Sequence, residues 1–355
     1  MTAPGSQRAV AWWLFACCLM VFVTMVVGGV TRLTHSGLSI VEWQPLIGAL
    51  PPLSEAHWLE LFAKYQQTPE FQKVNHDMTV DGFKFIFWWE WAHRLSGRLI
   101  GVVFLLPYLW FLLRGQLRGT LAAKVFGFFI LGGLQGAMGW YMVQSGLVDD
   151  PRVSHYRLAA HLGLAFVLFG LMLWTGLGML QPRGEGNAGQ TGDKPFWQVG
   201  AVSPAPTFTQ RLGNWLLALL LLMVLSGALV AGIRAGLAYN SFPLMNGHFL
   251  PPESLMLEPV WQNFLTNMAM VQFDHRLLAW MLLVLIPWFA WRTWRETPTA
   301  RPAALALAVW LAIQFGLGVA TLLKQVPVTL GAAHQAGAMV LFGLLIWANH
   351  ALRRF

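Results

Sequence analysis

Charged residues and cysteines are both scarce in this chain. Charged residues occupy 11% of its 355 positions, whereas soluble proteins carry about 25%. This shortage, spread over eight separate apolar runs, excludes an ordinary soluble enzyme, a disordered protein and a nucleic-acid-binding protein. The two cysteines, Cys17 and Cys18, are adjacent within the first apolar run, so they cannot join a loop to another part of the chain.

Hydrophobic residues are abundant enough for eight membrane-spanning helices. They make up 56% of the chain, with 19 Trp and 24 Phe among them. A spanning helix needs about 20 mainly apolar residues. Apolar runs of about this length lie near residues 11–31, 84–113, 125–146, 157–180, 212–233, 271–292, 303–323 and 328–349. The sequence therefore predicts an all-α polytopic protein of the lipid bilayer.

Basic residues indicate how the spans are oriented. They are concentrated at the two termini and in the connections that follow the second, fourth and sixth spans: Arg8, Arg114, Arg118, Lys124, Arg183, Lys194, Arg211, Arg292, Arg295, Arg301, Arg353 and Arg354. The positive-inside rule places this side in the cytoplasm. We therefore expect both termini to be cytoplasmic, and the net charge of +8 follows largely from this topology.

The two halves of the chain resemble each other. An offset of 199 residues pairs Gly28 with Gly227, and the second and sixth spans both contain His-Arg-Leu, at 93–95 and 275–277. We expect two pseudo-symmetric four-helix bundles. Residues 1–180 and 212–355 would form them, with a Gly- and Pro-rich cytoplasmic linker at 181–211. The external loop at 32–83 has aromatic residues between its charges, which predicts helical pieces on the membrane surface.

Four of the ten histidines lie near the external ends of even-numbered spans: His93, His161, His275 and His334. A lone intramembrane histidine would most simply hydrogen-bond across helices. Four at repeat-related positions indicate function, because polar groups at membrane depth are costly. Two facing imidazoles in a four-helix bundle can bind a haem iron from both sides. Zinc fits less well, and a proton relay or transport is the alternative.

Glu90 lies three residues before His93 and so shares its helical face. Its simplest structural role is an ion pair with Arg94 or Arg98. The equivalent residue in the second half is Gln272. This asymmetry predicts that the first half carries out chemistry and that the second half holds a permanent cofactor.

Four arginines near the histidines are candidates for binding haem propionates. Arg157 lies four residues before His161, on the same helical face at the external surface. Arg94, Arg98 and Arg276 are the other three candidates. For each of them, an ordinary intramembrane ion pair is an equally good interpretation.

Several segments of the chain resemble the haem A synthase family, in the branch shared by proteobacteria and mitochondria. They read TRLTHSGLS at 31–39, PEFQKVNHDMTVDGFKFIFWWEWAHRLSGR at 69–98, LQGAMGWYMVQSGL at 134–147 and PRVSHYRLAAHLG at 151–163. The resemblance covers nearly the whole chain. It implies the eight-span, two-bundle fold and the oxidation of the C8 methyl group of haem O to a formyl group, which gives haem A for terminal oxidases.

The resemblance also implies a role for each site residue. His93 and His161 would bracket the iron of the substrate haem O, with Glu90 beside the methyl group. His275 and His334 would ligate a resident haem b, the expected cofactor. The methyl group would be oxidised twice, first to an alcohol and then to a geminal diol that loses water. Glu90 would stabilise developing positive charge or act as a general base.

Location and partners follow from the same resemblance. We expect the bacterial inner membrane, haem sites toward the periplasm, and haem O synthase and an electron donor such as a ferredoxin as partners. Another branch of the family has a cysteine pair in the external loop, which this chain lacks, so here the loop is expected to shape the site by packing alone.

Two other functions use the same histidines. A di-haem b electron-transfer cytochrome needs all four, but gives no reason for the difference between Glu90 and Gln272. A transporter built from tandem bundles predicts a colourless protein. The bound pigment distinguishes these alternatives.

Overall fold

The structure, a computed structural model, describes residues 4–44, 47–180 and 206–353. These residues form helices and no strands: α1 (Pro4–Leu33), α2 (Glu55–Gln66), α3 (Pro69–Lys73), α4 (Val80–Leu113), α5 (Gly119–Gln144), α6 (His155–Met179), α7 (Phe208–Gly232), α8 (Asn263–Thr266), α9 (Met268–Glu296), α10 (Arg301–Leu323) and α11 (Val328–Ala351). Short 3-10 turns lie at Ile47–Ala49, Ala235–Leu237, Pro252–Leu255, Val260–Gln262 and Pro298–Ala300. Within the described residues, eight helices are long and apolar enough to cross a membrane, which confirms the predicted number of spans.

Hydrogen-bonding side chains fix where two of the spans begin. Thr79 precedes α4, and its hydroxyl accepts a hydrogen bond from the Gly82 amide at 3.3 Å. Thr207 precedes α7 and forms a reciprocal capping box with Gln210. Because of this cap, α7 begins at Phe208, and the second half starts there rather than at residue 212. Most of the predicted linker, residues 181–205, lies outside the described residues.

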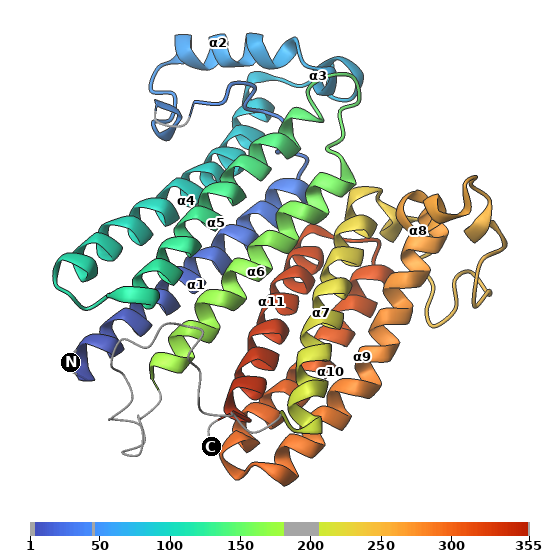
Figure 1. Ribbon diagram of the computed structural model, residues 1–355. Coiled ribbons are helices and arrows are strands. Elements are labelled where there is room, and N and C mark those ends of the chain that lie inside the picture. Colours follow the sequence, from blue (N-terminus) through green and yellow to red (C-terminus); the bar gives the residue numbers. More distant parts are fainter. Residues whose placement is uncertain (1–3, 45–46, 181–205, 354–355) are drawn as a thin grey trace.

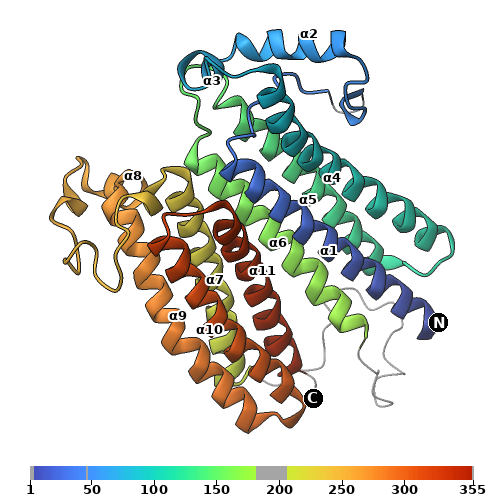
Figure 2. The same cartoon turned by 180° about the vertical axis from the view of Figure 1, so that it is seen from behind.

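The spans form two groups of four. In the first group, α1 and α5 both contact α4 and α6, and in the second group α7 and α10 both contact α9 and α11. Figures 1 and 2 show the groups side by side, with both chain ends at the end opposite α2 and α3. These contacts are consistent with the two predicted four-helix bundles.

Contacts between the halves involve residues that the repeat relates. The Arg32 guanidinium donates a hydrogen bond to the Ala231 carbonyl at the end of α7, with a distance of 2.6 Å from Nη2. Arg234 Nη2 lies 3.2 Å from His35 Nδ1, and these two residues, 199 apart, both have positive φ angles of 59° and 53°. Residues 32–35 of the first half thus contact the repeat-related residues 231–234 of the second half.

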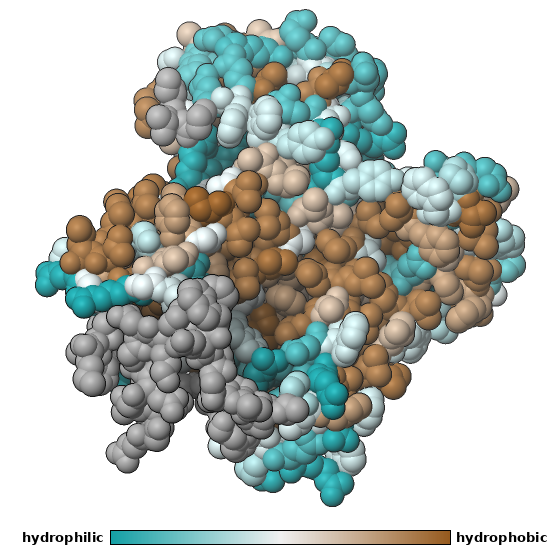
Figure 3. Space-filling view, viewed as in Figure 1, coloured by the Kyte–Doolittle hydropathy of each residue, from teal (hydrophilic) through white to brown (hydrophobic). Residues whose placement is uncertain are grey.

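The external loop packs over the outer end of the first group. Trp58, Phe62 and Tyr65 of α2 form a buried cluster with Phe83 and Phe87 of α4. The predicted helical pieces of this loop are therefore present as α2 and α3. Figure 3 shows hydrophilic residues gathered over this region, whereas hydrophobic residues cover the sides of the spans, as expected for helices that face lipid.

Replacing Gly232 by Ala should weaken the contact between the halves. A Cβ atom there would lie 2.9 Å from Cα of His155 on α6, and closer still to its Cβ. Neither atom can move without the helix, so we expect a loss of about 1–3 kcal/mol, seen as a lower apparent melting temperature in detergent. Gly127→Ala is the control, because nothing lies within 4 Å of its added Cβ. Equal melting temperatures for the two variants would contradict this packing.

Candidate functional site

Each of the four intramembrane histidines packs against a glycine on a neighbouring helix. A Cβ atom added to Gly28 of α1 would lie 2.6 Å from Cε1 of His93 on α4. The repeat-related Gly227 of α7 is placed in the same way, with its added Cβ 3.0 Å from Cε1 of His275 on α9. The second histidine of each half has the same packing, at 2.9 Å in both cases: Gly139 with His161, and Gly318 with His334. The glycines therefore leave the room that the rings occupy.

Hydrogen bonds to Nδ1 hold three of the four imidazole rings. His93 Nδ1 lies 3.1 Å from the Thr24 carbonyl oxygen, so Nδ1 carries the proton. His275 Nδ1 lies 2.8 Å from the Ser226 hydroxyl, and His334 Nδ1 lies 3.1 Å from the side-chain amide of Gln314. These hydrogen-bond partners were not predicted from the sequence. A proton on Nδ1 leaves Nε2 to act as a metal ligand, as in His93 and, with the Ser226 hydroxyl as acceptor, His275. At His334 the Gln314 amide is the donor and Nδ1 the acceptor.

The remaining ring, His161, is held through its backbone. Its carbonyl oxygen accepts a hydrogen bond from Gln135 Nε2 at 3.0 Å, as that of His334 does from Gln314 at 2.9 Å. Its own Nδ1 is buried and has no hydrogen-bond partner in the described part of the chain. Among the described residues, none of the four Nε2 atoms forms a hydrogen bond to protein either.

The donor set fits a haem better than a bare metal ion. No group of three or more His, Cys, Asp or Glu side chains that could hold a metal ion occurs in the residues that the structure describes. A structural zinc site needs four ligands, whereas a haem needs only two axial ligands because the porphyrin supplies the other four. The two histidines of each half also lie close enough to interact electrostatically.

Glu90 forms the ion pair with Arg94 that the sequence offered as its structural role. Its Oε1 accepts hydrogen bonds from Arg94 Nε at 3.0 Å and Nη2 at 2.7 Å. Its Oε2 accepts hydrogen bonds from the Ser39 hydroxyl at 2.7 Å and the Ile40 amide at 2.8 Å. The side chain is buried, and these four hydrogen bonds satisfy both of its oxygens. Ser39 and Ile40 belong to the external loop and were not expected at the site.

The second half repeats this geometry with a neutral side chain. Gln272 Oε1 accepts a hydrogen bond from Arg276 Nη2 at 3.2 Å, and Gln272 Nε2 donates to the Ala235 carbonyl at 2.9 Å. Arg276 Nη2 also donates to the Tyr239 carbonyl at 2.9 Å, as Arg94 Nη2 does to Ile40 at 2.8 Å. The arginine is thus neutralised by a carboxylate in the first half only.

The four candidate arginines differ in how their charge is used. Arg94 is paired with Glu90. Arg98 donates to the Gln44 carbonyl at 2.9 Å and does not pair with Glu90. Arg157 stacks on the Tyr141 ring, 3.6 Å from its centroid, and donates to its carbonyl. Neither Arg157 nor Arg276 has a carboxylate partner in the described ranges, so their charge is available to an anion.

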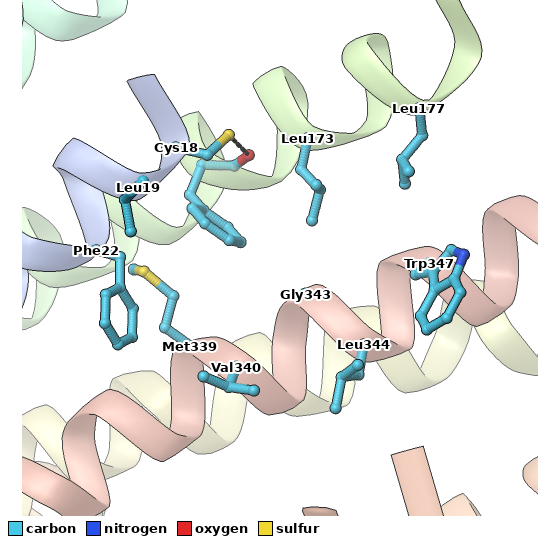
Figure 4. A pocket seen from close by; sticks show the side chains of 11 residues that line it. Cys18, Leu19, Phe22, Leu173, Leu177, Met339, Val340, Gly343, Leu344 and Trp347 are labelled. Atoms are coloured by element: carbon cyan, nitrogen blue, oxygen red, sulfur yellow. Dashed lines mark hydrogen bonds between the residues drawn. The ribbon is translucent and has the colours of Figure 1, made fainter. Parts of the chain in front are cut away.

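An apolar groove between the halves does not belong to this site. It has a volume of about 480 Å³ and lies between α1, α6 and α11. Figure 4 shows its lining, which is hydrophobic except for the Cys18 thiol, 3.7 Å from the Phe169 carbonyl oxygen. It contains no histidine or carboxylate.

Fold and site together define a helical membrane protein with two repeat-related halves, each with a pair of histidines on its spanning helices. The COX15-CtaA family, described as cytochrome oxidase assembly protein, matches residues 11–346. The chain belongs to this family.

Similar proteins cover almost the whole chain. A protein of Nitrosospira multiformis named "Heme A synthase" is 54% identical over 98% of this chain and 94% of its own length. A protein of the same name from Nitrosomonas eutropha is 48% identical with the same coverage. A third, from Parvibaculum lavamentivorans, is 46% identical over 99% of this chain and 96% of its own length.

Arg94→Gln should destabilise the protein more than the matched change Arg276→Gln. The first leaves the buried Glu90 carboxylate without its cation, which costs about 3–5 kcal/mol. The second leaves only a neutral Gln272, and its lost hydrogen bonds cost about 1–2 kcal/mol. Apparent melting temperatures in detergent measure the difference. The double variant Glu90→Gln/Arg94→Gln should recover part of the loss, and equal effects of the two single changes would contradict a charged Glu90.

Proposed function

We propose that this chain is a haem A synthase, which oxidises the C8 methyl group of haem O to a formyl group in two successive oxidations. The observation that carries this proposal is the near full-length identity, up to 54%, to relatives named "Heme A synthase". The site agrees with this function, because each half has two histidines for a haem iron and only one half adds a carboxylate.

The two halves have different roles in this proposal. His93 and His161 bind the iron of haem O, the substrate, and His275 and His334 bind that of haem b, the cofactor. Haem b supplies electron transfer when it is bound. The hydrogen bonds of Nδ1 to Thr24 and Ser226 support this assignment, since they present Nε2 as the ligand atom. Arg157 and Arg276 are the arginines best suited to bind propionates, because no carboxylate in the described ranges neutralises them.

Glu90 acts as a fixed negative charge beside the reacting methyl group. Arg94, Ser39 and Ile40 hold its carboxylate in one position. A carboxylate fixed by four hydrogen bonds is placed to stabilise positive charge that develops on the methyl carbon during oxidation. Of the two roles considered for Glu90, the structure therefore supports the electrostatic one.

We further propose that the enzyme lies in the bacterial inner membrane, with its haem sites toward the periplasm and both termini in the cytoplasm. His161, His275 and His334 lie about two turns into α6, α9 and α11, and His93 lies about four turns into the longer α4. The helices α2 and α3 cover this end of the first group (Figure 1). The opposite end carries the basic residues that mark the cytoplasmic side. Haem O synthase and an electron donor such as a ferredoxin are the proposed partners.

Glu90→Gln should slow the conversion of haem O to haem A on the order of 10²-fold, because it removes the fixed charge at the reacting carbon. Purified protein supplied with haem O and assayed by pigment extraction and mass measures this rate. Glu60→Gln, which changes an exposed carboxylate of α2 that pairs with Lys64, is the control and should convert haem O normally. Conversion by Glu90→Gln at the wild-type rate would refute the role of Glu90.

Removing one histidine from each half should remove different pigments. His161→Ala should lose haem O and its oxidation products but keep haem b, whereas His334→Ala should lose haem b. Extraction of each purified variant measures both pigments. If the wild-type protein contains haem b in both halves and no haem O or haem A, the protein is a di-haem cytochrome instead.

A further inference from the structure

A second carboxyl group, that of Glu70, is buried close to Glu90. Glu70 lies on α3 and is only 6% exposed. Its Oε2 accepts a hydrogen bond of 3.4 Å from the hydroxyl of Tyr65, which itself accepts one of 2.8 Å from Asn75 Nδ2. Within the described residues, Glu70 has no cation in ion-pair contact. A buried carboxyl group without a paired cation is unusual, because burial penalises its charged form.

The surroundings of Glu70 make it a group that titrates near neutral pH. Burial and the nearby charge of Glu90 raise the pKa of Glu70 to about 7, while the Tyr65 hydroxyl and the charge of Arg234 offset part of this rise. Three elements thus act on Glu70: Tyr65 from α2, Glu90 from α4 and Arg234 from the segment after α7. Glu90 differs from it because its carboxylate accepts four hydrogen bonds, two of them from the Arg94 guanidinium.

The proposed oxidation must exchange protons with solvent whichever oxygen source it uses. With water, the methyl group and one water give the alcohol, two protons and two electrons, which pass to an electron acceptor. With dioxygen, the methyl group, one dioxygen, two protons and two electrons from a donor give the alcohol and one water. Two protons therefore cross the boundary of the site in either case, and a group that titrates near pH 7 transfers them best.

We propose that Glu70 is the proton-transfer group between the methyl-oxidising site and the external solution. This inference rests on the proposed function. The Tyr65 hydroxyl is hydrogen-bonded to both Glu70 and Asn75, and Asn75 is partly exposed. Two hydrogen bonds therefore separate the Glu70 carboxyl group from a side chain at the surface. A purely structural Glu70, which places a negative charge in the first turn of α3, would not need to change its protonation state.

The first test is a titration that needs no haem O conversion. Infrared difference spectra of the purified full-length protein, recorded against pH, should show a buried carboxylic acid band with a midpoint near pH 7. The band should be missing in Glu70→Gln and shift to lower pH in Glu90→Gln, because the second carboxylate charge is gone. If Glu70→Gln leaves every such band in place, Glu70 does not titrate and the proposal is wrong.

The second test is the pH profile of haem O conversion. In the wild type, the rate should change through pH 7, rising with pH if water is the oxygen source and falling if dioxygen is. Glu70→Gln should lose this pH dependence and slow conversion on the order of 10²-fold, while its melting temperature stays unchanged. Glu70→Asp, which keeps a carboxyl group, should retain a conversion rate that depends on pH. If Glu70→Gln is active and keeps the wild-type pH profile of conversion, only the role of Glu70 is refuted. If the wild-type protein does not convert haem O, the proposed function is refuted, and this inference with it.

Discussion

Close packing of glycine against histidine between neighbouring helices is the contact on which the site depends. A ring can lie between two spans only where the facing residue has no side chain, and Gly28, Gly139, Gly227 and Gly318 provide this at all four histidines. Lipid offers no hydrogen bonds to an exposed imidazole, and three of the four rings are hydrogen-bonded through Nδ1 within the protein. The same contact is repeated in both halves, with Gly28 and Gly227 at matching positions of α1 and α7.

A single chemical difference separates the two halves. Ile40 and Tyr239 occupy equivalent places, and each accepts a hydrogen bond from an arginine through its carbonyl oxygen. Glu90 additionally accepts a hydrogen bond from the Ile40 amide, whereas Gln272 has an amide of its own and donates to the Ala235 carbonyl. One side chain in the repeat therefore decides whether the site contains a neutral ion pair or an arginine without a carboxylate.

The external loop takes part in the site rather than only covering it. Ser39 and Ile40 hold Glu90, and the aromatic cluster around Tyr65 buries Glu70 above it. A loop that contains no cysteine is held here by burial of large aromatic side chains, which stabilise it through the hydrophobic effect. The contacts of Arg32 and Arg234 with the opposite half then join this end of the two groups of spans.

The sequence by itself determined the eight spans, the repeat, the four histidines and the difference between Glu90 and Gln272. Spans follow from the length of apolar runs, and repeats follow from residue spacing, both of which are local properties of the chain. Only the tertiary structure decided that Arg94 rather than Arg98 neutralises Glu90, that Ser39 and Ile40 complete its contacts, and that Glu70 lies beside it. Ser39 and Ile40 lie 51 and 50 positions from Glu90 in the sequence, and even Arg94, four residues away, is selected over Arg98 only by how the side chains are placed. The burial of a carboxyl group and the donors around it arise only when the helices and the loop pack together, so no local pattern reports them.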